Sequence, residues 1–211
     1  SKNWGESTVR QIMHLTQNQA PLDITLKNMP ENSKVKWCER LYAKLISANS
    51  VRLEPVADVT QLPGYQKGEW WVQDCAAALP AKLMRDIKGK EIIDLCAAPG
   101  GKTAQLVSSG AHVIAIDKSS KRLKRLSDNL DRLALNAKVI CSDGRNYKPD
   151  FLVDGVLLDA PCSASGTIRR RPDVLIGNTA QQILELQSLQ IELCLAASKW
   201  INSGGTLVYV T

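Results

Sequence analysis

Short apolar segments of strand length alternate with longer segments of helical spacing from about residue 69 to residue 211. The apolar segments contain almost no polar positions, so neither face of a sheet built from them can lie against water. The alternation therefore predicts an α/β domain with a doubly wound parallel sheet in residues 67–211. We expect strands at 91–97, 112–118, 138–143, 154–159 and 205–211, and helices at 73–87, 101–108, 120–135 and 179–201.

Residues 1–66 have a different pattern, in which Pro, Gly and Asn repeatedly mark turns. Residues 21–28 alternate apolar and polar side chains, as a half-buried strand does. Residues 33–49 have apolar side chains at helical spacing, and Ser33 is a candidate N-cap. We therefore expect a small α+β segment in front of the larger domain.

Charge and cysteine usage limit the class of protein. The net charge is +6 and the pI is about 9.0, which suits a polyanionic partner but also fits an ordinary basic protein. No apolar run approaches the ~20 residues of a membrane helix, and the start of the chain lacks the apolar core of a signal peptide. The six cysteines never form CxxC, and neither histidine has a metal ligand at a suitable spacing. We expect a reduced, cytoplasmic, monomeric protein without a metal or a membrane partner.

The first predicted strand of the parallel sheet runs into DLCAAPGGKT, residues 94–103. Small residues let the backbone approach a ligand, and the helix that follows offers free N–H groups. A P-loop is excluded because the position five residues before Gly101 is Cys96, and no GxGxxG dinucleotide fingerprint is present. The alternative is a tight strand-to-helix turn without a ligand.

Acidic residues end the next two strands. Asp117 suits the two hydroxyls of a ribose, although it could instead cap the helix that follows. Asp143 precedes Gly144 and could accept a hydrogen bond from an exocyclic amine, although a simple turn explains it equally well in isolation. Since parallel strands end at one edge of a sheet, the three strand ends together predict a nucleoside pocket without a phosphate clamp. S-adenosylmethionine fits that description.

The fourth strand ends in DAPCSASG, residues 159–166. A thiolate at Cys162, next to Pro161 and close to Asp159, could attack a ring carbon. The alternative is a half-buried, inert cysteine.

DLCAAPGGKT and DAPCSASG together resemble the RNA (cytosine-5) methyltransferase family of the Sun/Fmu type, and most closely its bacterial 16S ribosomal RNA branch. Residues 62–74 and 166–173 extend the resemblance, which covers residues 50–211 well and residues 1–50 weakly. The resemblance implies a Rossmann-like class I S-adenosylmethionine-dependent methyltransferase fold. It also implies methyl transfer to carbon 5 of a cytosine in RNA through a cysteine–cytosine covalent adduct.

The resemblance assigns roles to individual residues. Asp117 would hold the ribose with Arg122 close by, and Asp143 would hold the adenine amine. Asp159 would face both the methyl donor and the target cytosine, and could protonate the ring nitrogen. Cys162 would help the methylated product to leave. The residues expected to line the cofactor, partly through backbone, are Cys96, Ala97, Ala98, Pro99, Gly100, Gly101 and Lys102.

The sequence departs from the family pattern at the end of the fifth strand. The family's nucleophilic cysteine follows a threonine there, and the sequence ends at Thr211. The last two strands of the usual seven-stranded sheet and the helical N-terminal RNA-binding domain are also not seen in this sequence. Because the sequence begins without Met, we expect a fragment or a processed protein. A protein ending at Thr211 is expected to bind cofactor weakly and not to methylate. Robust turnover would instead point to Cys162 as the nucleophile.

Two basic clusters are candidates for RNA contact. Arg169, Arg170 and Arg171 follow the reactive loop, where the phosphates that flank a flipped cytosine would pass, although a solvated charge run is equally consistent. The second cluster is Lys118, Lys121, Arg122, Lys124 and Arg125, which also fits the exposed face of a helix. Trp37 has the spacing of a core residue, whereas Trp70 and Trp71 fit either a core or a stacking surface.

Three functions are compatible with these residues. The first is cytosine-5 methylation of ribosomal RNA, which is the expected partner. A transfer RNA cytosine-5 methyltransferase of the same family is one rival, because the appended domains choose the target. A catalytically silent RNA-binding or assembly factor that keeps the fold is the other, since the Thr-Cys pair is not seen in this sequence.

Overall fold

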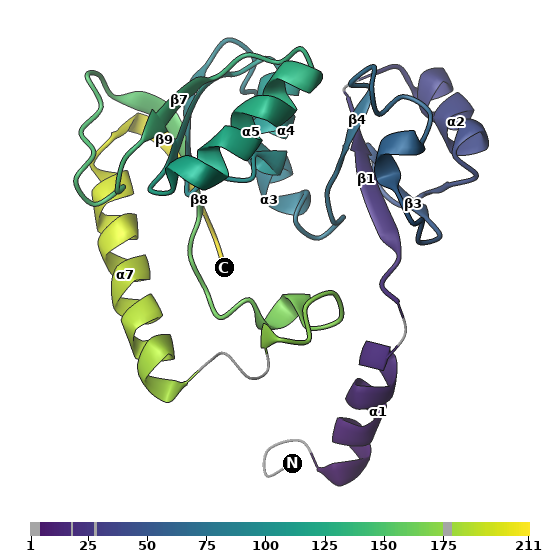
Figure 1. The fold of residues 1–211 in the computed structure, drawn as a ribbon. Helices are drawn as coiled ribbons and strands as arrows, with labels where there is room; N and C mark the ends of the chain where they lie inside the picture. Colours follow the sequence, from purple (N-terminus) through teal and green to yellow (C-terminus); the bar gives the residue numbers. More distant parts are fainter. Residues whose placement is uncertain (1–4, 18, 28, 175–178) are drawn as a thin grey trace.

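The computed structural model describes residues 5–17, 19–27, 29–174 and 179–211 and contains two separate sheets. An N-terminal helix, α1 (Glu6–Gln17), extends away from the body of the molecule (Figure 1). The two sheets follow α1 in the sequence and lie side by side (Figure 1). The first sheet is small and antiparallel, and the second is parallel. Both parts of the expected organisation are therefore present.

The antiparallel sheet has the strand order β2-β3-β1-β4. Its strands are β1 (Leu22–Leu26), β2 (Lys44–Leu45), β3 (Ser50–Leu53) and β4 (Trp70–Val72). Its core contains the buried side chains of Ile24, Val51 and Trp70, covered by Trp37 of α2 (Glu31–Arg40). The prediction of Trp37 as a core residue is confirmed. Trp70 and Trp71 are also buried, which excludes them as exposed stacking surfaces.

Two expectations for this part are corrected. The helix expected at 33–49 with Ser33 as N-cap begins at Glu31, has Pro30 at the N-cap position and ends at Arg40. It stops because Tyr42 takes a left-handed φ of 49° and the chain then pairs as β2 with β3. The strand expected at 21–28 is β1, and residue 28 lies outside the described residues.

The division at residue 66 stays a prediction. Because β4 pairs with β1, the antiparallel sheet includes residues 70–72, a few positions past that boundary. A short 3-10 helix, η1 (Val59–Gln61), lies in the connection between β3 and β4.

The parallel sheet has the order β7-β6-β5-β8-β9, and each neighbouring pair is parallel. Its strands are β5 (Glu91–Leu95), β6 (His112–Asp117), β7 (Lys138–Cys141), β8 (Val153–Asp159) and β9 (Ile201–Val210). The order reverses at β5, and this reversal places a ligand crevice beyond the carboxyl ends of β5 and β8. The predicted doubly wound, Rossmann-like sheet is confirmed.

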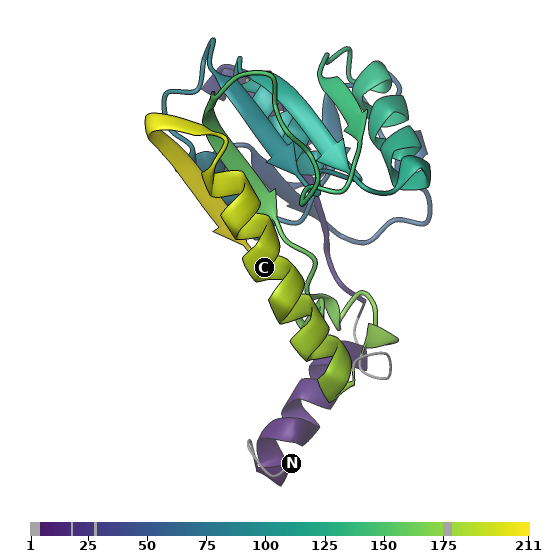
Figure 2. The ribbon, with the colours of Figure 1, turned by 90° about the vertical axis from the view of Figure 1, so that its left-hand side faces the viewer.

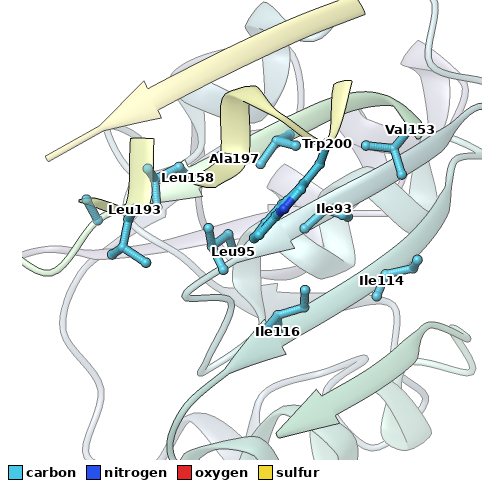
Figure 3. Packing of buried hydrophobic residues seen from close by; sticks show 11 residues of the cluster. Ile93, Leu95, Ile114, Ile116, Val153, Leu158, Leu193, Ala197 and Trp200 are labelled. Atoms are coloured by element: carbon cyan, nitrogen blue, oxygen red, sulfur yellow. The ribbon is translucent and has the colours of Figure 1, made fainter. Parts of the chain in front are cut away.

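Alternating strand residues bury both faces of this sheet, as a side-chain period of two requires. One face packs Ile93, Leu95 and Ile116 against Leu193 and Trp200, at the side covered by α7 (Ala180–Ser198) (Figures 2 and 3). The other face is covered by α3 (Leu79–Leu83), α4 (Gly101–Ser108) and α5 (Ser120–Arg132).

The helix expected at 73–87 is much shorter than predicted. Turns occupy residues 75–78, the helix α3 covers only Leu79–Leu83, and Pro80 lies in its first turn. The chain is extended at Met84 and has a left-handed φ of 52° at Asp86, so no helix can continue there.

Candidate cofactor and substrate site

The carboxyl ends of four parallel strands meet at one pocket, as expected from the strand order. Cys96 follows β5, Asp117 ends β6, Asp143 follows β7 and Pro161 follows β8, and all four line this pocket. We call it the nucleoside pocket; its other lining residues are Leu95, Ile116, Lys118, Arg122, Ser142, Gly144, Leu189 and Leu193. Carboxylates at its rim and apolar side chains on its walls suit a ligand with a flat ring and a polar sugar.

The loop between β5 and α4 forms one side of the nucleoside pocket through a tight backbone turn. Cys96 has a φ of 63° and Gly100 has a φ of 102°, both in the left-handed region. A Cβ at Gly100 would lie 2.8 Å from Leu126 Cγ of α5, so both the backbone angle and the packing require glycine there.

Asp117 is the most enclosed carboxylate of the nucleoside pocket, with 2% of its side chain exposed. Its oxygens accept hydrogen bonds from the backbone N–H of Ala98 at 3.2 Å and of Ser119 at 2.9 Å. Arg122 forms an ion pair with it at 3.2 Å and also donates to the carbonyl of Ala98. Ser119 caps α5, so the alternative that Asp117 is the N-cap is wrong.

Asp143 is held by Arg145, a residue that no sequence motif indicated. The Arg145 guanidinium donates to Asp143 Oδ2 at 2.7 Å and to Oδ1 at 3.0 Å, and its backbone N–H donates to Oδ1 at 3.0 Å. These hydrogen bonds hold the pKa of Asp143 down at about 2, so the carboxylate stays ionised at neutral pH. Arg145 also pairs with Glu192 of α7 at 3.0 Å, which ties the strand end to that helix.

Lys102 and Asp159 form an ion pair between the start of α4 and the end of β8. Lys102 Nζ lies 2.8 Å from Asp159 Oδ2, and the two side chains are 12% and 39% exposed. Asp94 is fully buried, accepts a hydrogen bond from Thr103 Oγ1 at 2.6 Å, and its Oδ1 has no hydrogen-bond partner within the described chain. Burial raises the pKa of Asp94 to about 7.

The two cysteines of the motifs have different environments. Burial, together with the carboxylates of Asp117 and Asp159, raises the pKa of Cys96 to about 12, so its thiol stays protonated and is no nucleophile. Cys162 is exposed, and its Sγ accepts a hydrogen bond from the backbone N–H of Ala164 at 3.4 Å. Cys162 is not among the residues that line the nucleoside pocket, although its neighbour Pro161 is.

A second hollow is lined by other residues of the loop 96–102 and by residues near the antiparallel sheet. Asp159 and Lys102 line it, and it is separate from the nucleoside pocket; we call it the substrate hollow. Its lining comes from both parts of the chain: Val59, Tyr65, Val72, Gln73, Asp74, Ala77, Ala97, Pro99, Gly101, Lys102, Arg125, Asn129, Arg132, Asp159 and Arg170. The contributions from Tyr65, Gln73 and Asn129 were not predicted, because no local pattern shows that these segments meet.

The three consecutive arginines point to different partners. Arg170 lines the substrate hollow and pairs with Asp74 at 2.7 Å. Arg169 donates to the carbonyl of Gln19 at 3.2 Å, and Arg171 pairs with Asp173 at 3.1 Å. Arg169 and Arg170 also line one further hollow together, and contact of the three arginines with RNA stays a prediction.

The described residues contain no group of three or more His, Cys, Asp and Glu side chains that could hold a metal ion. All six cysteines are free. No helix in the described ranges is long and apolar enough to cross a membrane.

Comparison with known proteins supports the architecture. The chain is 40% identical over 206 residues to the ribosomal RNA small subunit methyltransferase B of Proteus mirabilis, covering 92% of this chain and 49% of that protein. It is 45% identical over 168 residues to the protein of the same name from Vibrio vulnificus, covering 77% of this chain and 39% of that protein. The chain thus spans about half the length, or less, of these curated relatives.

Solved structures share the fold. A methyltransferase homologue from Pyrococcus horikoshii superposes with a TM-score of 0.79 at 26% identity, covering 98% of this chain and 68% of that one. NSun6 from the same organism has a TM-score of 0.82 at 20% identity, covering 99% and 80%. The model of the family described as 16S rRNA methyltransferase RsmB/F matches residues 81–211, so the chain belongs to that family.

Proposed function

We propose that this protein transfers a methyl group from S-adenosylmethionine to carbon 5 of a cytosine in RNA, and that its substrate is 16S ribosomal RNA. The observation that carries the proposal is the arrangement of two hollows around the loop 96–102. Cys96 of this loop lines the nucleoside pocket, and Lys102 of the same loop, paired with Asp159, lines the substrate hollow. The family and the names of its relatives support RNA as the substrate.

The nucleoside pocket has the groups that S-adenosylmethionine needs. Leu95, Ile116 and Leu189 provide apolar walls for a purine ring. Asp117 uses its carboxylate oxygens for the ribose hydroxyls while Arg122 and two backbone amides hold it in place. Asp143, kept ionised by Arg145, accepts from the adenine amine. When bound, the cofactor supplies an electrophilic methyl group on a sulfonium.

The substrate hollow provides acid–base groups for a pyrimidine. Asp159 lies at the end of β8 beside the ammonium group of Lys102, at 2.8 Å. This pair can hold the proton that the ring nitrogen takes up when the base is attacked. The ion pair therefore fits a cytosine whose Watson–Crick edge faces Asp159.

Carbon 5 of cytosine is a poor nucleophile until a thiolate adds to carbon 6. We assign that thiolate to the cysteine that the family pattern places directly after the threonine at the end of the fifth strand, Thr211. The addition forms a sulfur–carbon bond and moves the electrons of the 5,6 double bond to carbon 5. Carbon 5 then takes the methyl group as the sulfonium–methyl bond breaks, and S-adenosylhomocysteine is left. Loss of the proton on carbon 5 and breakage of the sulfur–carbon bond release the product. We assign Cys162, on the exposed loop after Asp159, to this release step.

The function is tested by bisulfite mapping of ribosomal and transfer RNA from a strain that lacks the gene. We expect one cytosine of 16S ribosomal RNA to lose its protection against conversion, and the gene to restore it. Loss of protection in transfer RNA alone would show that the substrate is wrong. Unchanged protection in both RNA classes would favour a silent RNA-binding factor.

Because ribosomal RNA is the proposed substrate, the proposed place of action is the cytoplasm.

A further inference from the structure

One cation of the substrate hollow has no partner within the described chain. Lys102 pairs with Asp159, and Arg170 pairs with Asp74. Arg132 donates to the carbonyls of Tyr65 and Trp70 and lies over the Tyr65 ring. Arg125 also lines the hollow, but no described carboxylate or hydrogen-bond acceptor pairs with it.

The charges around the substrate hollow therefore do not balance. Four cationic side chains line it, and only two carboxylates do. Since Arg132 is held by neutral carbonyls and Arg125 has no partner among the described residues, a positive potential remains at the wall formed by α5. This excess charge favours an anion.

Asn129 adds a neutral donor next to Arg125. The two residues are four positions apart on α5, so they lie on the same face of that helix, and both line the hollow. Asn129 Oδ1 accepts a hydrogen bond from Arg132 Nη2 at 2.7 Å, and no described acceptor takes up its amide N–H groups. A guanidinium and an amide NH2 side by side match the two non-bridging oxygens of a phosphodiester.

We infer that Arg125 and Asn129 form a phosphate subsite that holds the RNA backbone next to the target cytosine while the base lies against Asp159. The inference rests on the proposed function, because it needs a nucleotide in the substrate hollow. In this proposal α5 binds one particular phosphate, which is more specific than a general attraction of RNA by a basic helix. Lys124, the preceding residue, is exposed and does not line the hollow, so it provides a charge-matched control.

The test measures the affinity for 16S ribosomal RNA isolated from the strain without the gene, over a range of salt concentrations. Arg125→Gln should weaken binding about tenfold at low salt, since one charge-assisted contact is lost. It should also reduce the slope of log K against log salt by about 0.7, the value for one single-stranded phosphate contact. Lys124→Gln should have clearly smaller effects on both. Equal effects of the two variants would overturn the subsite.

A second experiment locates the phosphate. Short RNAs around the mapped cytosine would each carry one neutral methylphosphonate. When this group replaces the bound phosphate, wild type and Arg125→Gln should have the same affinity for the RNA. A difference that persists at every position would contradict the inference.

S-adenosylhomocysteine binding by both variants should equal that of the wild type, which shows that they are folded. If bisulfite mapping finds no dependence on the gene, the proposed function fails; if it finds one and Arg125 behaves like Lys124, only the subsite fails.

Discussion

Four aspartates near the ends of the parallel strands have four different environments, and these environments separate their roles. Asp117 is enclosed by backbone amides and Arg122, and Asp143 is held by Arg145. Asp159 is paired with Lys102 and partly open to the substrate hollow. Asp94 is fully buried beside Thr103.

Asp117→Asn should weaken cofactor binding about tenfold or more, because the amide cannot balance Arg122 or accept from both backbone N–H groups. Isothermal titration with S-adenosylhomocysteine measures the loss. Asp128→Asn, on the exposed side of α5, is the matched control and should bind as the wild type does. Equal affinities for all three proteins would remove Asp117 from the cofactor site.

Asp94 should make stability depend on pH. Burial raises its pKa in the folded state to about 7, while the unfolded chain titrates near the ordinary value of 3.8. Between these values the folded state binds the extra proton, so the free energy of unfolding falls as pH rises, by at most about 1.4 kcal/mol per pH unit from this residue.

Asp94→Asn removes that dependence and can still accept the hydrogen bond from Thr103. Urea unfolding at several pH values should therefore show the variant gaining stability relative to wild type from about pH 4 to pH 7 and no further gain above it. A difference that stays constant with pH would show that Asp94 is ionised in the folded protein.

At the residue scale, the sequence identified the carboxylates that close the nucleoside pocket and Arg122 beside Asp117, but not Arg145, which holds Asp143. Asp117 and Asp143 could be predicted because parallel strands end at one edge. Arg145 could have been suspected from its place two residues after Asp143, whereas Gln73 and Tyr65 reach the substrate hollow only through the packing of the two sheets.

The elements of the parallel sheet were predictable because each carries its own signal. The strands are continuous apolar runs, and α5 places Leu123, Leu126 and Leu130 on one buried face. Prediction failed where the tertiary pairing overrides local spacing. The helix expected at 33–49 gives way to β2, whose register with β3 is a contact between segments that no helical period shows.

Gly100→Ala tests the turn between β5 and α4. Its φ of 102° is unfavourable for any side chain, and the new Cβ would lie 2.8 Å from Leu126 Cγ. The substitution should lower the free energy of unfolding by about 2–4 kcal/mol, from strain and overpacking together. Urea unfolding measures it.

Gly89→Ala is the control for that substitution. Gly89 also has a positive φ, 73°, but a Cβ there would meet nothing within 4 Å, so only the backbone strain remains. If the two variants lose the same stability, the contact with Leu126 contributes nothing.

At the scale of the whole molecule, the two sheets are joined by polar contacts through Gln73 and Arg132, which both line the substrate hollow. Trp71 Nε1 donates to Gln73 Oε1 at 2.8 Å, and Gln73 Nε2 donates to Gln105 Oε1 of α4 at 2.7 Å. On the other side, Arg132 of α5 donates to the carbonyls of Tyr65 and Trp70. These contacts hold the antiparallel sheet against the helices of the parallel sheet. Figure 1 shows the antiparallel sheet beside these helices.

Arg132→Gln should destabilise the protein by about 2–3 kcal/mol, because it leaves two carbonyls without their charged donor. Arg125→Gln, on the same helix and without a partner in the described chain, should change stability by less than about 0.5 kcal/mol. Urea unfolding followed by tryptophan fluorescence compares them, since Trp37 and Trp70 lie in the smaller core and Trp200 in the larger. Similar losses for both variants would contradict the role of Arg132 between the sheets.

A crystal structure of the protein with S-adenosylhomocysteine would show whether the strand ends bind the cofactor as we propose. We expect the ribose at Asp117, the adenine amine at Asp143, and the sulfur on the side of Lys102 and Asp159. A ligand bound away from these three carboxylates, or with its sulfur turned from the substrate hollow, would contradict the proposal.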